Sequence, residues 1–242
     1  MSPDDRPDHD RPDHDRPNHD RPNHGQTEAA RLDLGRTERI DLPEAVYCRS
    51  KTVEQCVDIV TTMLADGTDA VIATRTTDEQ RLALEAIEPE ASAAGTLVWR
   101  PRKATGATAA VVAAGTSDLP VAEECRLTLE AMGHGVDLSV DVGVAGLHRL
   151  LDVVPSLATA DVIVAVAGME GALPTVLGGL VAQPLIAVPT SVGYGSAFEG
   201  MTALAGMMTS CAPGVAVIGI DNGYGAACAA HRFLRRLGSD RV

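Results

Sequence analysis

Five strand-like runs, each followed by a helical pattern, constrain the fold of the C-terminal half of this chain. The runs are rich in β-branched and small apolar residues and begin near positions 107, 136, 161, 184 and 215. The helical patterns that follow them cover residues 118–133, 145–157, 171–182, 197–209 and 224–237. Strands that alternate with helices form parallel sheets with helices on both faces. The sequence therefore predicts a three-layer, doubly wound α/β domain of flavodoxin-like type over residues 105–242.

A smaller α/β lobe is predicted for residues 36–104, preceded by a disordered tail over residues 1–35. In the lobe, Thr52 and Gln55 have the spacing of a capping box at the start of an amphipathic helix. In the tail, the repeat DRPDHDRPDHDRPNHDRPNH has a proline every fifth residue and almost no apolar side chain. Its histidines alternate with acids, but a flexible array of ligands has no fixed geometry, so we predict no defined metal site there.

Composition restricts the classes of function. The net charge is −13, and only Lys51 and Lys103 among the 20 basic residues are lysines, which argues against a nucleic-acid-binding surface. A strongly acidic, lysine-poor surface suits a high-salt cytoplasm and predicts a halophilic source. There is no apolar stretch of membrane-spanning length and no signal-peptide pattern, so we expect a cytoplasmic protein that does not bind membranes. The five cysteines lack CxxC spacing and are predicted to be free thiols.

The links that follow the predicted strands are short, polar and rich in glycine. They read GTSD, DVGVAG, GMEG, PTSVGYG and DNGYG, and the third contains Glu170. The carboxyl ends of parallel strands meet at one edge of the sheet, where helix N-termini also offer N–H groups to anions. We therefore expect one pocket there, with a phosphorylated or carboxylated ligand. The links contain neither the G-x-G-x-x-G fingerprint nor a P-loop, which disfavours an ordinary NAD dehydrogenase or NTPase.

Several separated motifs resemble known enzymes. GTSDLPVAEE, GLHRLL, AGMEGALPTVLGGL and PLIAVPTSVGYG look like the class I aminoimidazole ribonucleotide carboxylases (PurE-like). DVGVAGLHRLL, SCAPG, IDNGYGAA and the upstream DLPEAVYCRSKTVEQ and VIATR are more closely similar to the LarB family. This family starts the biosynthesis of the nickel-pincer nucleotide cofactor. The resemblance runs from about residue 40 to about residue 230.

The resemblance implies a carboxylase and hydrolase, a pyridinium-3,5-biscarboxylic acid mononucleotide synthase. Its substrates would be nicotinic acid adenine dinucleotide and CO2 or bicarbonate, with carboxylation at pyridinium C5 and release of AMP. Hydrolysis of a phosphoanhydride implies Mg²⁺, for which Asp141 and Asp221 are candidate ligands, without any organic cofactor. The family also implies a homo-oligomer, expected to be an octamer.

The resemblance also implies roles for individual residues. Cys211, which precedes a Pro-Gly turn within the matching motifs, is predicted as the nucleophile that adds to the ring. Glu170 is predicted as the base that removes the C5 proton, and His148 is the alternative base. Asp118 could also cap the helix that follows it. The predicted substrate-binding residues lie in the links at the strand ends: Gly115, Thr116, Ser117, Asp118, Gly168, Met169, Gly171, Pro189, Thr190, Ser191, Gly193, Asp221 and Asn222.

Two alternatives remain open from the sequence. One is a carboxylase or mutase acting on aminoimidazole ribonucleotide, which needs neither Cys211 nor the N-terminal lobe. The other is a non-catalytic nucleotide-binding or regulatory module that shares only the fold.

Overall fold

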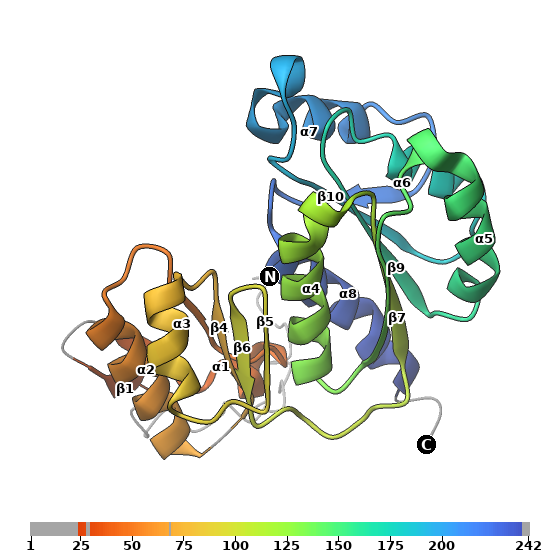
Figure 1. Ribbon diagram of the computed structural model, residues 1–242. Helices are drawn as coiled ribbons and strands as arrows, with labels where there is room; N and C mark the ends of the chain where they lie inside the picture. Colours follow the sequence, from red (N-terminus) through yellow and green to blue (C-terminus); the bar gives the residue numbers. More distant parts are fainter. Residues whose placement is uncertain (1–23, 28–29, 68, 239–242) are drawn as a thin grey trace, which may run out of the picture.

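A five-stranded parallel sheet organises the C-terminal half of the chain, as the sequence predicts. The computed structural model describes residues 24–27, 30–67 and 69–238, and this sheet has the strand order β11-β10-β9-β7-β8 (Figure 1). Its strands are β7 (Thr108–Ala113), β8 (Gly135–Ser139), β9 (Val162–Ala167), β10 (Leu185–Pro189) and β11 (Val215–Val217). If these five strands are numbered 1 to 5 in sequence, their order across the sheet from β8 to β11 is 2-1-3-4-5. This is the flavodoxin-like topology, with its switch point between β7 and β9.

Helices cover both faces of this sheet because alternate strand residues point to opposite sides. Ala109 and Val111 of β7 contribute to the core beneath α4 (Leu119–Ala131) and α8 (Gly223–Gly238). Ala110 and Val112 contribute to the core beneath α5 (Leu147–Leu157), α6 (Leu173–Gly178) and α7 (Met201–Met208). Three short 3-10 turns precede helices: η1 (Thr116–Asp118), η2 (Val144–Gly146) and η3 (Gly195–Gly200).

The N-terminal lobe has a separate four-stranded mixed sheet. Its strand order is β3-β4-β6-β5, from β3 (Ala45–Tyr47), β4 (Val71–Thr74), β6 (Thr96–Trp99) and β5 (Ala91–Ala93). The lobe's helices are α1 (Arg36–Ile40), α2 (Val53–Asp66) and α3 (Asp78–Glu85). The predicted capping box at the start of α2 is confirmed. The backbone N–H of Gln55 donates to Thr52 Oγ1 at 3.2 Å, and the backbone N–H of Thr52 donates to Gln55 Oε1 at 3.0 Å.

Ordered structure begins before residue 36, where the sequence placed the end of the tail. Strands β1 (His24–Gln26) and β2 (Arg31–Asp33) form an antiparallel hairpin, and Leu32 is buried in the core of the N-terminal lobe. The predicted boundary is wrong at this point because the low-complexity repeat ends at residue 24, and the apolar residues after it can pack. Residues 1–23 and 28–29 of the predicted tail lie outside the described residues.

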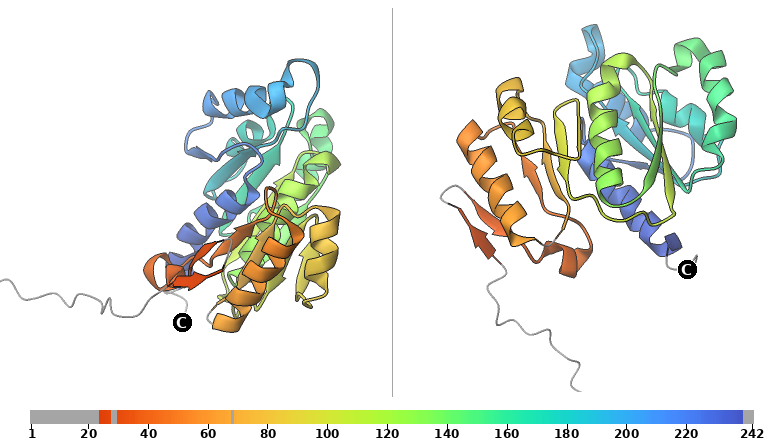
Figure 2. Two further views of the ribbon diagram at one scale, coloured as in Figure 1. Left: turned by 90° about the vertical axis from the view of Figure 1, so that its left-hand side faces the viewer. Right: turned by 60° about the horizontal axis from the view of Figure 1, so that its bottom comes forward.

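Helix α4 is shared by the two lobes. Ile72 and Val98 of the N-terminal sheet, with Ala70 just before β4, pack against Leu127 and Ala131 of α4. The other side of α4 covers the parallel sheet. Figures 1 and 2 show the N-terminal lobe lying beside α4. The lobe is therefore held against the second domain by a continuous apolar contact, and the carboxyl ends of β4 and of the parallel strands can border one cleft.

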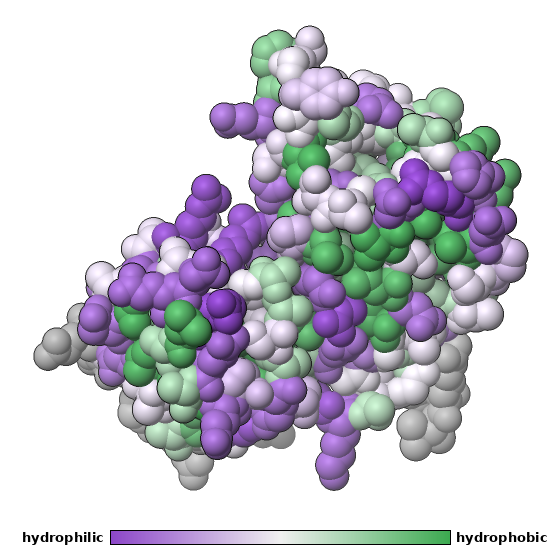
Figure 3. Space-filling view, in the orientation of Figure 1, coloured by the Kyte–Doolittle hydropathy of each residue, from purple (hydrophilic) through white to green (hydrophobic). Residues whose placement is uncertain are grey.

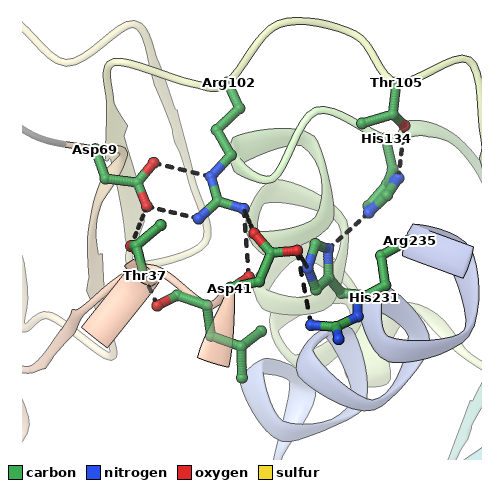
Figure 4. Close-up of polar contacts among 9 residues, drawn as sticks. Thr37, Asp41, Asp69, Arg102, Thr105, His134, His231 and Arg235 are labelled. Carbon is green, nitrogen blue, oxygen red and sulfur yellow. Dashed lines mark hydrogen bonds and ion pairs between the residues drawn. The ribbon is translucent and has the colours of Figure 1, made fainter. Parts of the chain in front are cut away.

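A polar network also joins the lobes, near the amino ends of the parallel strands (Figure 4). Arg102 binds Asp69 at 2.6 Å and Asp41 at 3.0 Å. Asp41 also accepts from His231 Nε2 of α8 at 3.3 Å, and His231 Nδ1 lies 2.9 Å from His134 Nε2. Both histidines are only 3% exposed. Burial lowers the pKa of each histidine, for His134 to about 4.

Candidate active site

The links after β7 and β9 line one cavity at the topological switch point. Because the chain leaves β7 toward α4 on one face and β9 toward α6 on the other, a gap opens between the two strand ends. The residues that line this gap come from four links: Ala114, Gly115, Ser117 and Asp118; Gly143, Val144 and Ala145; Ala167, Gly168, Met169, Glu170, Ala172 and Leu173; and Val192. We call it the switch-point cavity, and its volume is about 260 Å³. The structure thus brings the predicted residues Gly115, Ser117, Asp118, Gly168, Met169 and Glu170 together.

Tight backbone packing places Glu170 at the mouth of this cavity. A side chain at Gly168 would put a Cβ atom 2.3 Å from the Val192 carbonyl oxygen, so only glycine fits there. The next residue, Met169, has a φ of +54°, an uncommon conformation for a non-glycine residue that recurs at functional sites. The Glu170 side chain is exposed and forms no hydrogen bond or ion pair with the described residues. Its carboxylate can therefore accept a proton from a ligand in the cavity.

Asp118 holds three strand-end links together from inside the protein. The Thr190 hydroxyl donates to Asp118 Oδ1 at 2.6 Å, the Gly115 N–H donates to Oδ2 at 2.9 Å, and the Gly168 N–H also donates to this carboxylate. Asp118 is 3% exposed, and this burial raises the pKa of its carboxyl group although the hydrogen bonds favour the charged form. The predicted side-chain cap on α4 is not formed. The carboxylate instead fixes the positions of the groups around the cavity.

The links after β10 and β11 are also bonded to each other. The Ser191 N–H donates to Asp221 Oδ1 at 2.7 Å, and the Asp221 N–H donates to the Pro189 carbonyl at 2.8 Å. Asn222 Oδ1 accepts the Gly225 N–H at 2.7 Å and so satisfies an amide at the start of α8. Thr190 is fully buried, whereas Thr116, Ser191 and Gly193 are exposed and Gly171 packs against Ala203 of α7. These predicted residues build the sheet edge, and of them Ser191 and Asp221 face the cleft beside the switch-point cavity.

His148 is not brought into the switch-point cavity. It is the second residue of α5 and is exposed, while the neighbouring Val144 and Ala145 line the cavity. The next residue, Arg149, forms an ion pair with Asp141. In a single chain, Glu170 is therefore better placed than His148 to act on a ligand in the cavity.

Cys211 lies in the link between α7 and β11 and is the one exposed cysteine. Burial raises the pKa of the thiols of Cys48, Cys56, Cys125 and Cys228, which makes them weak nucleophiles. The neighbouring Ser210 hydroxyl lies 2.7 Å from the Thr175 hydroxyl of α6. The link that contains Cys211 therefore lies against α6, the helix that begins just after Glu170. Cys211 itself is not among the residues that line the switch-point cavity.

The described side chains do not form a preformed Mg²⁺ site. In the described part of the chain, no group of three or more His, Cys, Asp or Glu residues is arranged to hold a metal ion. Asp141 is paired with Arg149, and Asp221 accepts the Ser191 N–H. Mg²⁺ commonly binds through one or two carboxylates and substrate phosphates, so the expected need for this ion stays a prediction.

The contribution of the N-terminal lobe to the carboxyl edge of the parallel sheet was not predicted from the sequence. Arg75 follows β4 and donates from Nε to Glu124 Oε1 of α4 at 3.1 Å, and it also donates to the Asp221 carbonyl oxygen. Arg49 lies beside it in the same cleft. The motif VIATR contains Arg75, but the motif alone does not show that this lobe faces the carboxyl ends of the second sheet.

Comparison with known proteins agrees with this architecture. Residues 108–239 match the family model for AIR carboxylase, and residues 24–97 match the model for the LarB/PurE-like N-terminal domain. The fold and the switch-point cavity therefore belong to a carboxylase or mutase type of enzyme. The chain is a member of the LarB family, which is related to PurE.

Two proteins of Methanocaldococcus jannaschii are similar to this chain. An uncharacterized protein is 38% identical over 213 residues, covering 82% of this chain and 81% of its own length. An N5-carboxyaminoimidazole ribonucleotide mutase is 33% identical over 129 residues, covering 51% of this chain and 76% of the mutase. Among the helices that the structure describes, none is long and apolar enough to cross a membrane.

Proposed function

We propose that this enzyme carboxylates nicotinic acid adenine dinucleotide at pyridinium C5 and hydrolyses its phosphoanhydride. The products are pyridinium-3,5-biscarboxylic acid mononucleotide and AMP, which would begin the biosynthesis of the nickel-pincer cofactor. The observation that carries the proposal is the Glu170 carboxylate, which pairs with none of the described residues and lies at the mouth of the switch-point cavity, in a chain that matches both the AIR carboxylase model and the LarB/PurE-like N-terminal domain.

The reaction requires a nucleophile and a base. A pyridinium ring is too electron-poor to attack CO2, so the Cys211 thiolate first adds to a ring carbon beside or opposite the nitrogen. The new C–S bond moves an electron pair onto the nitrogen and leaves an enamine, whose C5 attacks CO2. Glu170 then takes the C5 proton, the C–S bond breaks, and the ring becomes aromatic again. The carboxylation exchanges one proton for one carboxylate, and the hydrolysis consumes one water, so no oxidant or reductant is needed.

The position of Cys211 requires an additional step or an additional chain. Because Cys211 is exposed beside α6 rather than in the switch-point cavity, either its link moves toward the cavity or a second copy supplies the thiol. The expected homo-octamer would allow the second arrangement. Coexpression of Cys211→Ser with Glu170→Gln tests it, because mixed oligomers regain an intact site only if the two residues come from different chains. Activity above that of either variant alone supports a shared site, and no recovery supports a site within one chain.

The activity is tested with nicotinic acid adenine dinucleotide, bicarbonate and Mg²⁺, followed by mass analysis of the products. We expect the wild type to form a dicarboxylated mononucleotide and AMP. Cys211→Ser should form no carboxylated product because a serine hydroxyl is a much poorer nucleophile, whereas the control Cys228→Ser should remain active. Turnover of an aminoimidazole ribonucleotide instead would favour the mutase alternative. Binding without turnover of either substrate would favour the regulatory module.

A further inference from the structure

The switch-point cavity cannot hold a whole dinucleotide. Its volume of about 260 Å³ lies below the usual 300–1,000 Å³ of ligand pockets, and a dinucleotide consists of two nucleotide-sized halves. None of the described residues that line it is Lys, Arg or His, and its ionisable residues are the acids Asp118 and Glu170. A diphosphate carries negative charge that this lining does not compensate. The diphosphate and the second nucleoside therefore need another part of the protein.

A cleft between the lobes adjoins this cavity, and its lining contains two arginines together with the acids Glu124 and Asp221. Ser117 and Val192 line both spaces, so the cleft, of about 450 Å³, continues directly from the switch-point cavity. We call it the interlobe cleft. Arg49 and Arg75 line it, together with hydroxyl side chains that include Thr76, Thr77 and Ser191. Figure 3 shows the surface hollowed between the N-terminal lobe and the upper part of the second domain, with hydrophilic residues at the border.

The two arginines of the interlobe cleft differ in what they can offer to a phosphate group. Arg75 has a φ of +56°, and its guanidinium is fixed between lobes by Glu124 and the Asp221 carbonyl. Because Glu124 already neutralises it, Arg75 offers remaining N–H donors more than net charge. Arg49 is exposed and forms no hydrogen bond or ion pair with any residue that the structure describes. It is thus free to pair with a phosphate without losing another contact.

A third space extends the cleft and contains aromatic rings. It has a volume of about 350 Å³ and shares Arg75 and Glu124 with the interlobe cleft. Two of the chain's three tyrosines, Tyr47 and Tyr224, line it, and Asn222 lies in the same wall. Tyr47 is 45% exposed, with the Arg75 guanidinium 5.8 Å from the centre of its ring. An exposed ring beside an amide side chain is suited to stack on a purine base and to bond its edge.

We propose that the interlobe cleft and the third space that extends it bind the adenylate half of the dinucleotide. Arg49 and Arg75 hold the diphosphate, and the adenine lies against Tyr47, while the pyridinium half occupies the switch-point cavity. This inference rests on the proposed function for the identity of the substrate. The comparisons support a separate contribution from the N-terminal lobe. The mutase, named for a single ribonucleotide, aligns with 51% of this chain, whereas this chain has an additional N-terminal domain.

Calorimetric titration of the full-length protein tests the inference with two probes. ADP represents the diphosphate and adenosine, and nicotinic acid mononucleotide represents the other half. We expect the wild type to bind both. Arg49→Ala should weaken ADP binding about tenfold or more, because a charge-assisted hydrogen bond is lost, and should leave mononucleotide binding unchanged. Tyr47→Leu should also weaken ADP binding about tenfold through the loss of stacking.

The control is Arg81→Ala, which removes an arginine of the same lobe that pairs with Glu85 on α3, outside the cleft. It should bind ADP like the wild type. Equal ADP affinity in Arg49→Ala, Tyr47→Leu and the wild type would overturn the inference, as would a failure of ADP to bind. Melting temperatures check that both cleft variants are folded.

Activity assays separate the failure of this inference from the failure of the proposed function. Cleft-dependent ADP binding without carboxylation of the dinucleotide would refute the function and retain an adenylate site. Carboxylation with an unchanged KM in Arg49→Ala and in Tyr47→Leu would retain the function and refute the site.

Discussion

The buried histidine pair at the lobe junction makes stability depend on pH in a calculable way. Asp41 can only accept a hydrogen bond, so His231 Nε2 carries a proton, and His231 Nδ1 then accepts from His134 Nε2–H. His134 Nδ1 is left to accept from the Thr105 hydroxyl at 3.0 Å (Figure 4). Every donor in this chain meets an acceptor when both histidines are neutral. A proton added to His134 would also lie near Arg102 and His231, in a site shielded from water.

The sign and size of the effect follow from the pKa of His134. Burial, together with His231 and Arg102, lowers this pKa from the ordinary 6.5 to about 4. The unfolded chain therefore takes up the proton first as the pH falls. The stabilisation is present above pH 6.5 and is lost progressively as the pH falls toward 4. Between pH 7 and pH 5, this histidine alone should reduce the free energy of unfolding by about 2 kcal/mol.

Chemical denaturation at pH 7 and pH 5 measures this loss in the wild type and in His134→Gln. Glutamine does not titrate, and its side-chain amide can still donate to His231. The loss of stability between the two pH values should therefore be smaller in the variant by about 2 kcal/mol. Titrating groups outside this hydrogen-bonded chain, which include Asp118, affect both proteins alike and cancel in the comparison. An equal loss in the two proteins would show that His134 is not kept neutral by its surroundings.

Three further predictions concern the base, the surface charge and the N-terminal repeat. Glu170→Gln keeps the shape of the side chain but removes its basicity, so dinucleotide binding should persist while kcat falls at least about a hundredfold; near-normal kcat would move the base to His148 or to water. Residues 24–242 contain 26 acidic and 16 basic residues, so molar KCl should screen their repulsion and raise the melting temperature, and a flat or falling melting temperature would refute the halophilic interpretation. Removal of residues 1–23 should leave melting temperature and turnover unchanged because the repeat has almost no apolar side chains, and a large loss of turnover would show that its His and Asp residues have a function.

The elements of the second domain could be predicted because their signals are local. The alternation of strand and helix patterns predicts the parallel sheet, and Gly168 and Glu170 could be placed after β9 from a few neighbouring residues. The capping box at Thr52 depends on residues three positions apart. Such patterns act within one turn or one strand, so the order of the residues is enough to reveal them.

The tertiary structure alone decided which of these groups meet. Three hydrogen-bonded side-chain pairs are far apart in the sequence: Asp118 and Thr190 are separated by 72 positions, Arg75 and Glu124 by 49, and His134 and His231 by 97. These pairings depend on the strand order at the switch point and on the apolar contact of the N-terminal sheet with α4, neither of which has a local sequence signal. The same contact brings Arg49 and Arg75 to the interlobe cleft, which adjoins the switch-point cavity. The sequence therefore determined which chemical groups are available to the site. The strand order and the packing of the two lobes determined which of these groups share a cavity, because burial and charge pairing depend on distance in space and not on separation along the chain.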